Sequence, residues 1–282
     1  MRCPSRFAHF AFLFALALPT ACTDKAKLSE KGAAADIGSL TQLAQKDVEE
    51  IERGMPLGAQ KLSKLYAKNA DPHQDLPAAR LALQRMRRDV PDLTVAKSTF
   101  FALADDKGIA IRNDLEEDAM AGQNLITIFP ELSKALSGAY ATTTGKFPGP
   151  QPPSGPDKDW IASVPVKKDD GTVAGLLVTG WTFRRFAFHL QETLKHDLEV
   201  KQKNGKLPVL YVSIFDKTGV YSAPQTPPVN DKALADLDLV AKTASGPAQG
   251  TLDITNRDFG WAAARIPGMG PDIGIALLRS EL

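Results

Sequence analysis

The sequence predicts an α+β fold in which long N-terminal helices precede two modules, each an antiparallel sheet of about five strands with flanking helices. Apolar residues recur at steps of three and four over residues 37–90, which is helical spacing. Beyond Pro91 the pattern changes to short strands joined by turns that contain Asp and Gly, as in hairpins. This strand-and-turn pattern, interrupted by a helix, occurs twice, which indicates two modules of one type.

Residues 1–21 have the features of a secretory signal peptide. Arg2 and Arg6 form a basic start, and residues 7–18 form an apolar run shorter than the roughly 20 residues that span a bilayer. Cys22 follows the expected cleavage point directly. This arrangement resembles the lipobox of bacterial lipoproteins. The resemblance implies that the Cys22 thiol receives a diacylglycerol and its new amino end an acyl chain.

The lipobox resemblance has one departure, since Pro19 stands where leucine is usual at the third position before the cysteine. The alternative is an ordinary secreted protein in which Cys22 is incidental. Residues 22–36 are small, polar and charged, and they are predicted to form a flexible tether between lipid and folded body. We expect no other membrane anchor, because no further apolar run approaches 18 residues.

The composition excludes several classes of protein. Cleavage before Cys22 leaves 282 − 21 = 261 residues, 32 basic and 33 acidic side chains, and one cysteine. The mature chain therefore lacks the strong positive charge of a nucleic-acid-binding protein, and its monomer can form no disulfide. Its length suits one large or two small domains.

Residues 37–95 are predicted to form the N-terminal helices. A first helical pattern covers residues 37–67 and is interrupted by Gly54 and Pro56, where we expect a kink or a break. A second helix is expected over residues 76–90, and Pro91 ends it because the residue before a proline avoids helical geometry.

Residues 96–200 are predicted to form the first module. Strands are expected at 99–104 and 109–112, joined by a turn that ends in Gly108, and again at 160–166 and 173–181. The same reading places short helices at 125–136, a proline-rich loop at 147–159 and a longer helix at 183–200.

Residues 205–282 repeat this order in a smaller second module. Strands are expected at 209–215, 220–221, 251–254, 260–266 and 273–278, with one helix at 231–244. FFALADDKGIAIRND from Phe100 aligns with LYVSIFDKTGVYSAP from Leu210, and the closing hairpins begin at Trp160 and Trp261. A spacing of about 110 residues is too long for a solenoid and fits two similar domains.

Three segments of the first module resemble the Cache family of extracellular sensor domains. They are LADDKGIAIRND from Leu103, AGQNLITIFPELSKALSG from Ala121 and WIASVPVKKDDGTVAGLLVTG from Trp160. The resemblance extends over residues 37–282 and implies two PAS-like modules, in a tandem of Cache domains or as one Cache domain with a PAS-like partner. It also implies a ligand held between the sheet and the loop and helix before the closing hairpin.

No catalytic motif is present, so we expect no enzymatic activity and no cofactor. His189 and His196 are seven residues apart on one predicted helix, too far for one metal ion without a third element, and we expect them to be solvated. Asp105, Asp106 and Asp216 are interpreted as turn residues rather than calcium ligands. We therefore expect no metal site.

The resemblance to Cache domains implies six candidate ligand-binding residues. They lie on the parts of the sheet, the loop and the first hairpin that would surround the implied pocket. These residues are Arg112, Asn113, Tyr140, Trp160, Ser163 and Thr179. Trp160 has an alternative role in packing between sheet and helix. Arg184 and Arg185 could meet an anionic ligand or be solvated. The Tyr, Arg, Trp-Tyr and Asp series of amino-acid-binding double Cache sensors is missing.

Together these observations predict a lipid-anchored, periplasm-facing sensor of the bacterial cell envelope. It binds a small organic ligand, and because the sequence ends without an output domain, we expect it to signal to a protein partner by contact. The alternative is a structural or assembly lipoprotein that uses the apolar stripes of residues 37–67 and 183–200 to bind a partner. By resemblance to lipoprotein sorting signals, Thr23 rather than Asp after Cys22 implies a slight preference for the outer membrane.

Overall fold

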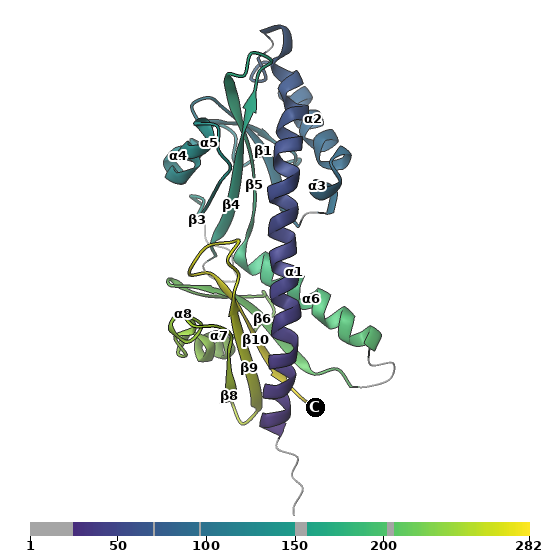
Figure 1. Cartoon of the computed structure of the whole chain (residues 1–282), viewed down its shortest axis with the longest axis vertical. Helices are drawn as coiled ribbons and strands as arrows, with labels where there is room; N and C mark the ends of the chain where they lie inside the picture. The colour runs from purple at the N-terminus through teal and green to yellow at the C-terminus, as the bar shows by residue number, and fades with distance from the viewer. Residues whose placement is uncertain (1–24, 70, 96, 150–156, 202–205) are drawn as a thin grey trace, which may run out of the picture.

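The computed structural model describes residues 25–69, 71–95, 97–149, 157–201 and 206–282, so the predicted signal peptide and Cys22 lie outside it. Helix α1, Lys25–Leu62, lies alongside two sheets stacked along its length (Figure 1). Its 38 residues span about 57 Å at 1.5 Å per residue. Within the described residues, no helix has the length and apolar character needed to cross a bilayer.

The prediction of a flexible tether over residues 22–36 is wrong from Lys25 onward, because this segment is the first part of α1. Ser29 and Ala33 are fully buried. Strand β10, Gly274–Ser280, holds the helix here, since the Arg279 guanidinium pairs with Asp36. Gly32 allows this close approach, because a Cβ there would lie 2.4 Å from Arg279 Nε. Packing against β10 therefore orders a segment whose composition alone is tether-like.

The predicted break at Gly54 and Pro56 is also wrong, because α1 continues through both residues. Leu93 of α3, Pro91–Val95, packs directly on Gly54, where a Cβ would lie 2.6 Å from Leu93 Cδ2. This contact keeps the helix in place although Pro56 supplies no N–H to the carbonyl of Glu52. Helix α2, Leu76–Asp89, matches the second predicted helix.

The first module contains one antiparallel sheet of five strands in the order β2-β1-β5-β4-β3. Its elements are β1 Phe100–Asp105, β2 Ala110–Asn113, α4 Leu125–Ile128, η2 Pro130–Leu132, α5 Ser133–Leu136, β3 Ala141–Gly145, β4 Asp159–Lys167, β5 Val173–Thr182 and α6 Phe183–Lys201. The strands and helices predicted for this module are confirmed, whereas most of the loop predicted at 147–159 lies outside the described residues and Asp159 already belongs to β4. Strand β3 is not predicted by the sequence, because its residues Ala-Thr-Thr-Thr-Gly do not alternate between apolar and polar. In the structure it is an edge strand that pairs with β4.

The second sheet has the same strand order, β7-β6-β10-β9-β8, which confirms the internal repeat at the level of topology. Its elements are β6 Val209–Asp216, β7 Gly219–Ser222, α7 Pro228–Ala235, α8 Leu239–Lys242, β8 Ala248–Asp253, β9 Asp258–Arg265 and β10. The single helix predicted at 231–244 is instead two. Asp238 separates them in a left-handed conformation, φ 48°, and its carboxylate accepts a hydrogen bond from Ala241 N at 3.2 Å.

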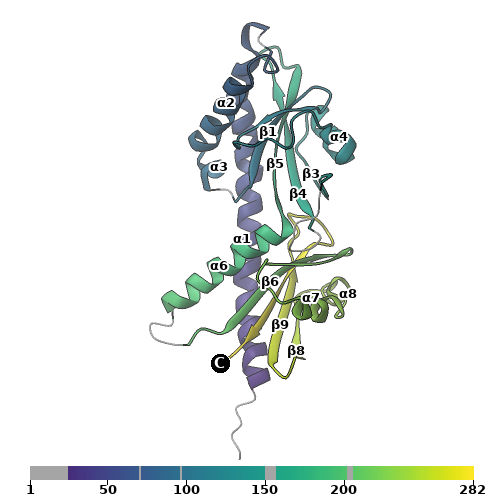
Figure 2. The same cartoon turned by 180° about the vertical axis from the view of Figure 1, so that it is seen from behind.

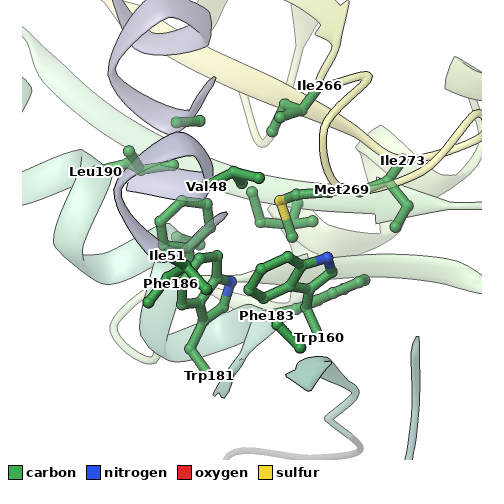
Figure 3. Close-up of a cluster of buried hydrophobic side chains, with 14 of the residues drawn as sticks. Val48, Ile51, Trp160, Trp181, Phe183, Phe186, Leu190, Ile266, Met269 and Ile273 are labelled. Carbon is green, nitrogen blue, oxygen red and sulfur yellow. The ribbon is translucent and has the colours of Figure 1, made fainter. Parts of the chain in front are cut away.

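The two modules and α1 meet around a cluster of aromatic side chains (Figure 3). Trp160 stacks on Trp181 with ring centroids 4.4 Å apart, and Trp181 stacks on Phe186 of α6 at 4.6 Å. Val48 of α1 and Met269 of the second module lie in the same cluster. Figure 2 shows α6 leaving this junction between the two sheets. The core is therefore continuous from one module to the other.

Charged residues at this junction are mostly paired. His189 is not solvated as predicted, because its Nε2 lies 3.2 Å from the buried Asp47 carboxylate of α1, whereas His196 is exposed. Arg184 is 8% exposed and donates from Nη1 to the carbonyl of Ser222 at 3.1 Å. Its guanidinium therefore joins α6 to the second module, and only Arg185 of that pair is exposed.

We predict that replacing Trp181 with alanine destabilises the fold by about 3–5 kcal/mol, because it leaves a cavity at the junction of both modules and α1. Urea unfolding followed by circular dichroism measures this change. Leu81→Ala is the control, since Leu81 is 45% exposed on α2 and its truncation should change stability by less than about 0.5 kcal/mol. A loss of similar size in both variants would contradict the assigned role of the junction.

Candidate functional site

The six predicted ligand-binding residues do not converge on one pocket, because they lie on both faces of the first sheet. Trp160 and Tyr140 pack with the cluster that faces α1. Thr179 of β5 lies on the same face of the sheet and is fully buried. Its hydroxyl donates a hydrogen bond to the carbonyl of Phe100 at 2.5 Å. Ser163 lies on the opposite face, three residues from Trp160 on the same strand. Trp160 therefore packs between the sheet and the helices, which was the alternative to its predicted role in ligand binding.

Arg112 and Asn113 hold the loop that follows β2. Arg112 Nη1 lies 2.9 Å from a carboxylate oxygen of Asp118, and Nη2 donates to the carbonyl of Leu115 at 2.9 Å. The Asn113 side chain accepts from Leu115 N at 2.9 Å. These polar groups are already satisfied by the loop, so binding a ligand would require exchanging existing bonds.

The sheet face that contains Ser163 is covered by α4, η2 and α5 and is largely apolar. Phe129 and Phe147 meet edge to face with centroids 4.9 Å apart, and Leu125 and Ile161 pack beside them. The Ser163 hydroxyl is buried there without a hydrogen-bond partner in the part of the chain that the structure describes.

Tyr140 lies at a cavity of about 510 Å³ on the other side, where the last turns of α1 approach β4. Helix α1 contributes Pro56, Ala59 and Gln60 to its wall, and Ser63 follows at the start of η1, Ser63–Asn69. Its volume is in the range of small-molecule sites.

Strand β4 and the turn after it supply the rest of the wall. Val164 and Pro165 give apolar surface, and Lys167, Lys168 and Asp169 give charge. Gly138 also lines the cavity, and a Cβ on it would lie 3.8 Å from Lys167 Nζ. The Lys167 ammonium group therefore lies over the turn that leads to Tyr140.

The Tyr140 phenol is the most buried polar group of this cavity. Its oxygen has no hydrogen-bond partner among the described residues. Burial raises the pKa of Tyr140 well above its ordinary value, and the charge of Glu52 adds to this effect. The phenol is therefore neutral at physiological pH and can donate a hydrogen bond to an occupant of the cavity.

A more polar cleft of about 370 Å³ lies beside this cavity and shares Lys168 with it. His73 Nε2 lies 3.6 Å from Asp105 Oδ2 in this cleft. Asp105 Oδ1 accepts from the backbone N–H groups of Lys107 at 2.9 Å and Ile109 at 2.8 Å, which confirms its interpretation as a turn residue. No group of three or more His, Cys, Asp or Glu within the described ranges has the arrangement of a metal site.

No protein-family model matches this sequence, and no curated protein does. The fold, in contrast, is similar to solved sensor domains. One is a domain of a sensory box/GGDEF family protein from Vibrio parahaemolyticus, with a TM-score of 0.56, 12% identity, and coverage of 91% of this chain and 97% of the other.

Two chemoreceptor domains are similar at a TM-score of 0.50. The ligand-binding domain of the Pseudomonas aeruginosa PAO1 amino acid chemoreceptor PctC, in complex with GABA, is 13% identical, with coverage of 89% of this chain and 99% of the other. The periplasmic sensory domain of the Campylobacter jejuni chemoreceptor Tlp1 is 14% identical, with coverage of 91% and 95%. At these identities the likeness shows the fold alone, which is α+β with a long helix and two PAS-like sheets of five strands.

Sequence reasoning identified Tyr140 but missed the α1 side of its cavity. Pro56 was interpreted as a helix breaker, so Gln60 and Ser63 were not expected beside β4. Lys167 had no distinguishing signal, because a lysine at a strand end is usually a solvated surface residue. Only the docking of α1 on the first sheet brings these residues together.

Asp159, at the start of β4, provides a test of burial at the edge of this module. Desolvation raises its pKa to about 6, and the hydrogen bond donated by Phe147 N offsets this only in part. The folded state therefore holds a proton that the unfolded state releases between pH 4 and pH 6, and we predict that stability falls as pH rises through this window.

Asp159→Asn should flatten this fall and stabilise the protein at pH 7 by about 1 kcal/mol, because the buried charge is removed. Urea unfolding at pH 4, 5, 6 and 7 measures both effects. Asp197→Asn, at an exposed position of α6, should retain the wild-type profile. A wild-type stability that rises between pH 4 and 6, with no difference in Asp159→Asn, would contradict the prediction.

Proposed function

We propose that this protein is a lipid-anchored extracytoplasmic ligand-binding sensor without enzymatic activity, which passes ligand occupancy to a partner protein by contact. The observation that carries the proposal is the cavity between α1 and β4, in whose wall the Tyr140 phenol has no hydrogen-bond partner among the described residues. The sensor-type fold supports it. Apolar walls with few polar groups are what small-molecule sites require.

Helix α1 is the element that connects this cavity to the rest of the protein. Residues near Pro56 form the wall, and the same helix packs on β9 and β10 of the second module. An occupant that presses on α1 therefore acts on an element shared by both sheets. Small shifts of packed helices are a common form of switching in sensors and enzymes.

The anchoring part of the proposal rests on Cys22, three residues before α1 begins. With Cys22 acylated, the second module lies next to the bilayer and the cavity lies near the far end of α1. We place the protein in the bacterial envelope, facing the periplasm, with the outer membrane favoured by Thr23. More than one acyl chain is required for firm anchoring.

The alternative, an assembly lipoprotein that binds partners through its helical stripes, has less support. The apolar stripe of α1, including Leu40 and Ile51, and that of α6, including Leu190, are buried within this chain. These stripes are therefore occupied by the protein's own sheets and are not available to a partner helix.

We predict that at least one small organic compound raises the unfolding temperature of the full chain purified in detergent, since a ligand at 100 times its Kd stabilises by about 2.7 kcal/mol. A metabolite library screened by thermal shift measures this. Ser63→Trp should abolish the shift, because the indole fills the cavity. Gln42→Trp, at an exposed position of the same helix, should retain it. A well-folded protein with no ligand in the library would contradict the proposal.

We predict that Cys22→Ser moves the protein from the membrane fraction to the soluble fraction, because both acylation sites depend on the thiol-bearing residue. Fractionation and intact mass measure the loss of the lipid. Cys3→Ser is the matched control and should remain on the membrane, since residue 3 belongs to the cleaved signal. If both variants fractionate alike, Cys22 is not the anchor.

A further inference from the structure

We infer that the occupant of the cavity between α1 and β4 is a small organic anion with an apolar body. The inference rests on the proposed ligand-binding function and adds the chemical class of the ligand. It is carried by the distribution of charge, hydrogen-bond donors and apolar surface around the cavity.

Two ammonium groups define the charge of the site. Lys167 and Lys168 both line the cavity, and among the described residues neither ammonium group makes a hydrogen bond or ion pair. The charge of Lys168 also acts on Asp170, which is exposed and is not part of the wall. Asp169 is the one carboxylate in the wall, and it is exposed. Glu52, whose charge acts on Tyr140, is exposed on α1 and is not part of the wall. The lining therefore carries a net positive charge, which favours an anion.

The uncharged polar groups of the wall can also donate to an anion. The Tyr140 phenol is neutral, half-buried and without a partner within the described residues. A hydrogen bond to a charged acceptor is stronger than one to a neutral acceptor, and a low-dielectric surrounding strengthens it further. The amide of Gln60 adds a second neutral donor from α1.

The rest of the wall requires an apolar portion of the ligand. Ala59, Val164 and Pro165 line the cavity with hydrocarbon, and Pro56 of α1 adds to this apolar surface. A volume of about 510 Å³ is much larger than a single inorganic anion. Phosphate alone would leave this surface hydrated, so the apolar contact adds affinity only for a compound with a hydrocarbon or aromatic body.

Matched acid and amide pairs test this inference, because they differ in charge and little in shape. We expect the full chain in detergent to bind 4-phenylbutyrate and indole-3-acetate about tenfold more tightly than the corresponding amides, measured by isothermal titration calorimetry. Inorganic phosphate should bind more weakly than either acid. Raising the salt concentration should reduce the preference for the acids, since partly exposed charges are screened.

Three variants separate charge from the other contacts. The double variant Lys167→Gln, Lys168→Gln should bring the acid-to-amide ratio close to one, whereas Lys195→Gln on exposed α6 should leave it unchanged. Tyr140→Phe should weaken the acids by roughly threefold to tenfold and the amides by less, because the lost donor forms a stronger hydrogen bond with a charged acceptor than with a neutral one.

The inference is overturned if the amides bind as tightly as the acids, if a matched amine such as phenethylamine binds more tightly, or if the double lysine variant keeps the preference. It is also overturned if the metabolite screen finds a neutral or cationic ligand and neither acid binds. In that case the proposed ligand-binding function is still supported, and only the anionic class of the ligand is wrong. A screen with no ligand of any class removes the proposed function itself.

Discussion

The stack of Trp160, Trp181 and Phe186 against α1 is the interaction on which the rest of the architecture depends. It brings together the first sheet, helix α6, the long helix and, through Met269, the loop between the last two strands of the second module. All three aromatic rings are almost completely buried, so their transfer from water contributes a large share of the apolar stabilisation at one location. The modules thus share one core, and α1 cannot shift at one sheet without affecting the contacts at the other.

This constraint also forms the cavity. Because α1 is held at the aromatic stack and by Leu93 at Gly54, its next two turns pass over β4 without filling the space beside Tyr140. Within the described residues, the ammonium groups of Lys167 and Lys168 make no hydrogen bond or ion pair, whereas at the junction Asp47 faces His189 and Lys158 pairs with Asp216. The wall of the cavity therefore holds cationic groups that an occupant can contact.

Much of the fold could be predicted from the sequence because its signals are local. The Asp-containing turns that end in Gly108 and Gly219 mark hairpins, and alternation marks the strands between them. The candidate site was harder to predict. A resemblance to a sensor family indicates which strand a residue belongs to, but not which residues of other elements lie beside it. Trp160 and Ser163 are an odd number of positions apart on β4, so they face opposite sides of the sheet and cannot line one pocket.

The sequence by itself determined the hairpins, the repeat of two modules and the helical character of most of residues 37–90. Only the tertiary structure decided that residues 25–36 are helical, that α1 continues past Pro56, and that Tyr140 lies beside Gln60 and Lys167. The reason is the range of the forces involved. Turn chemistry and periodicity act over a few residues, whereas the order of a polar segment depends on Arg279, more than two hundred residues away, packing against it.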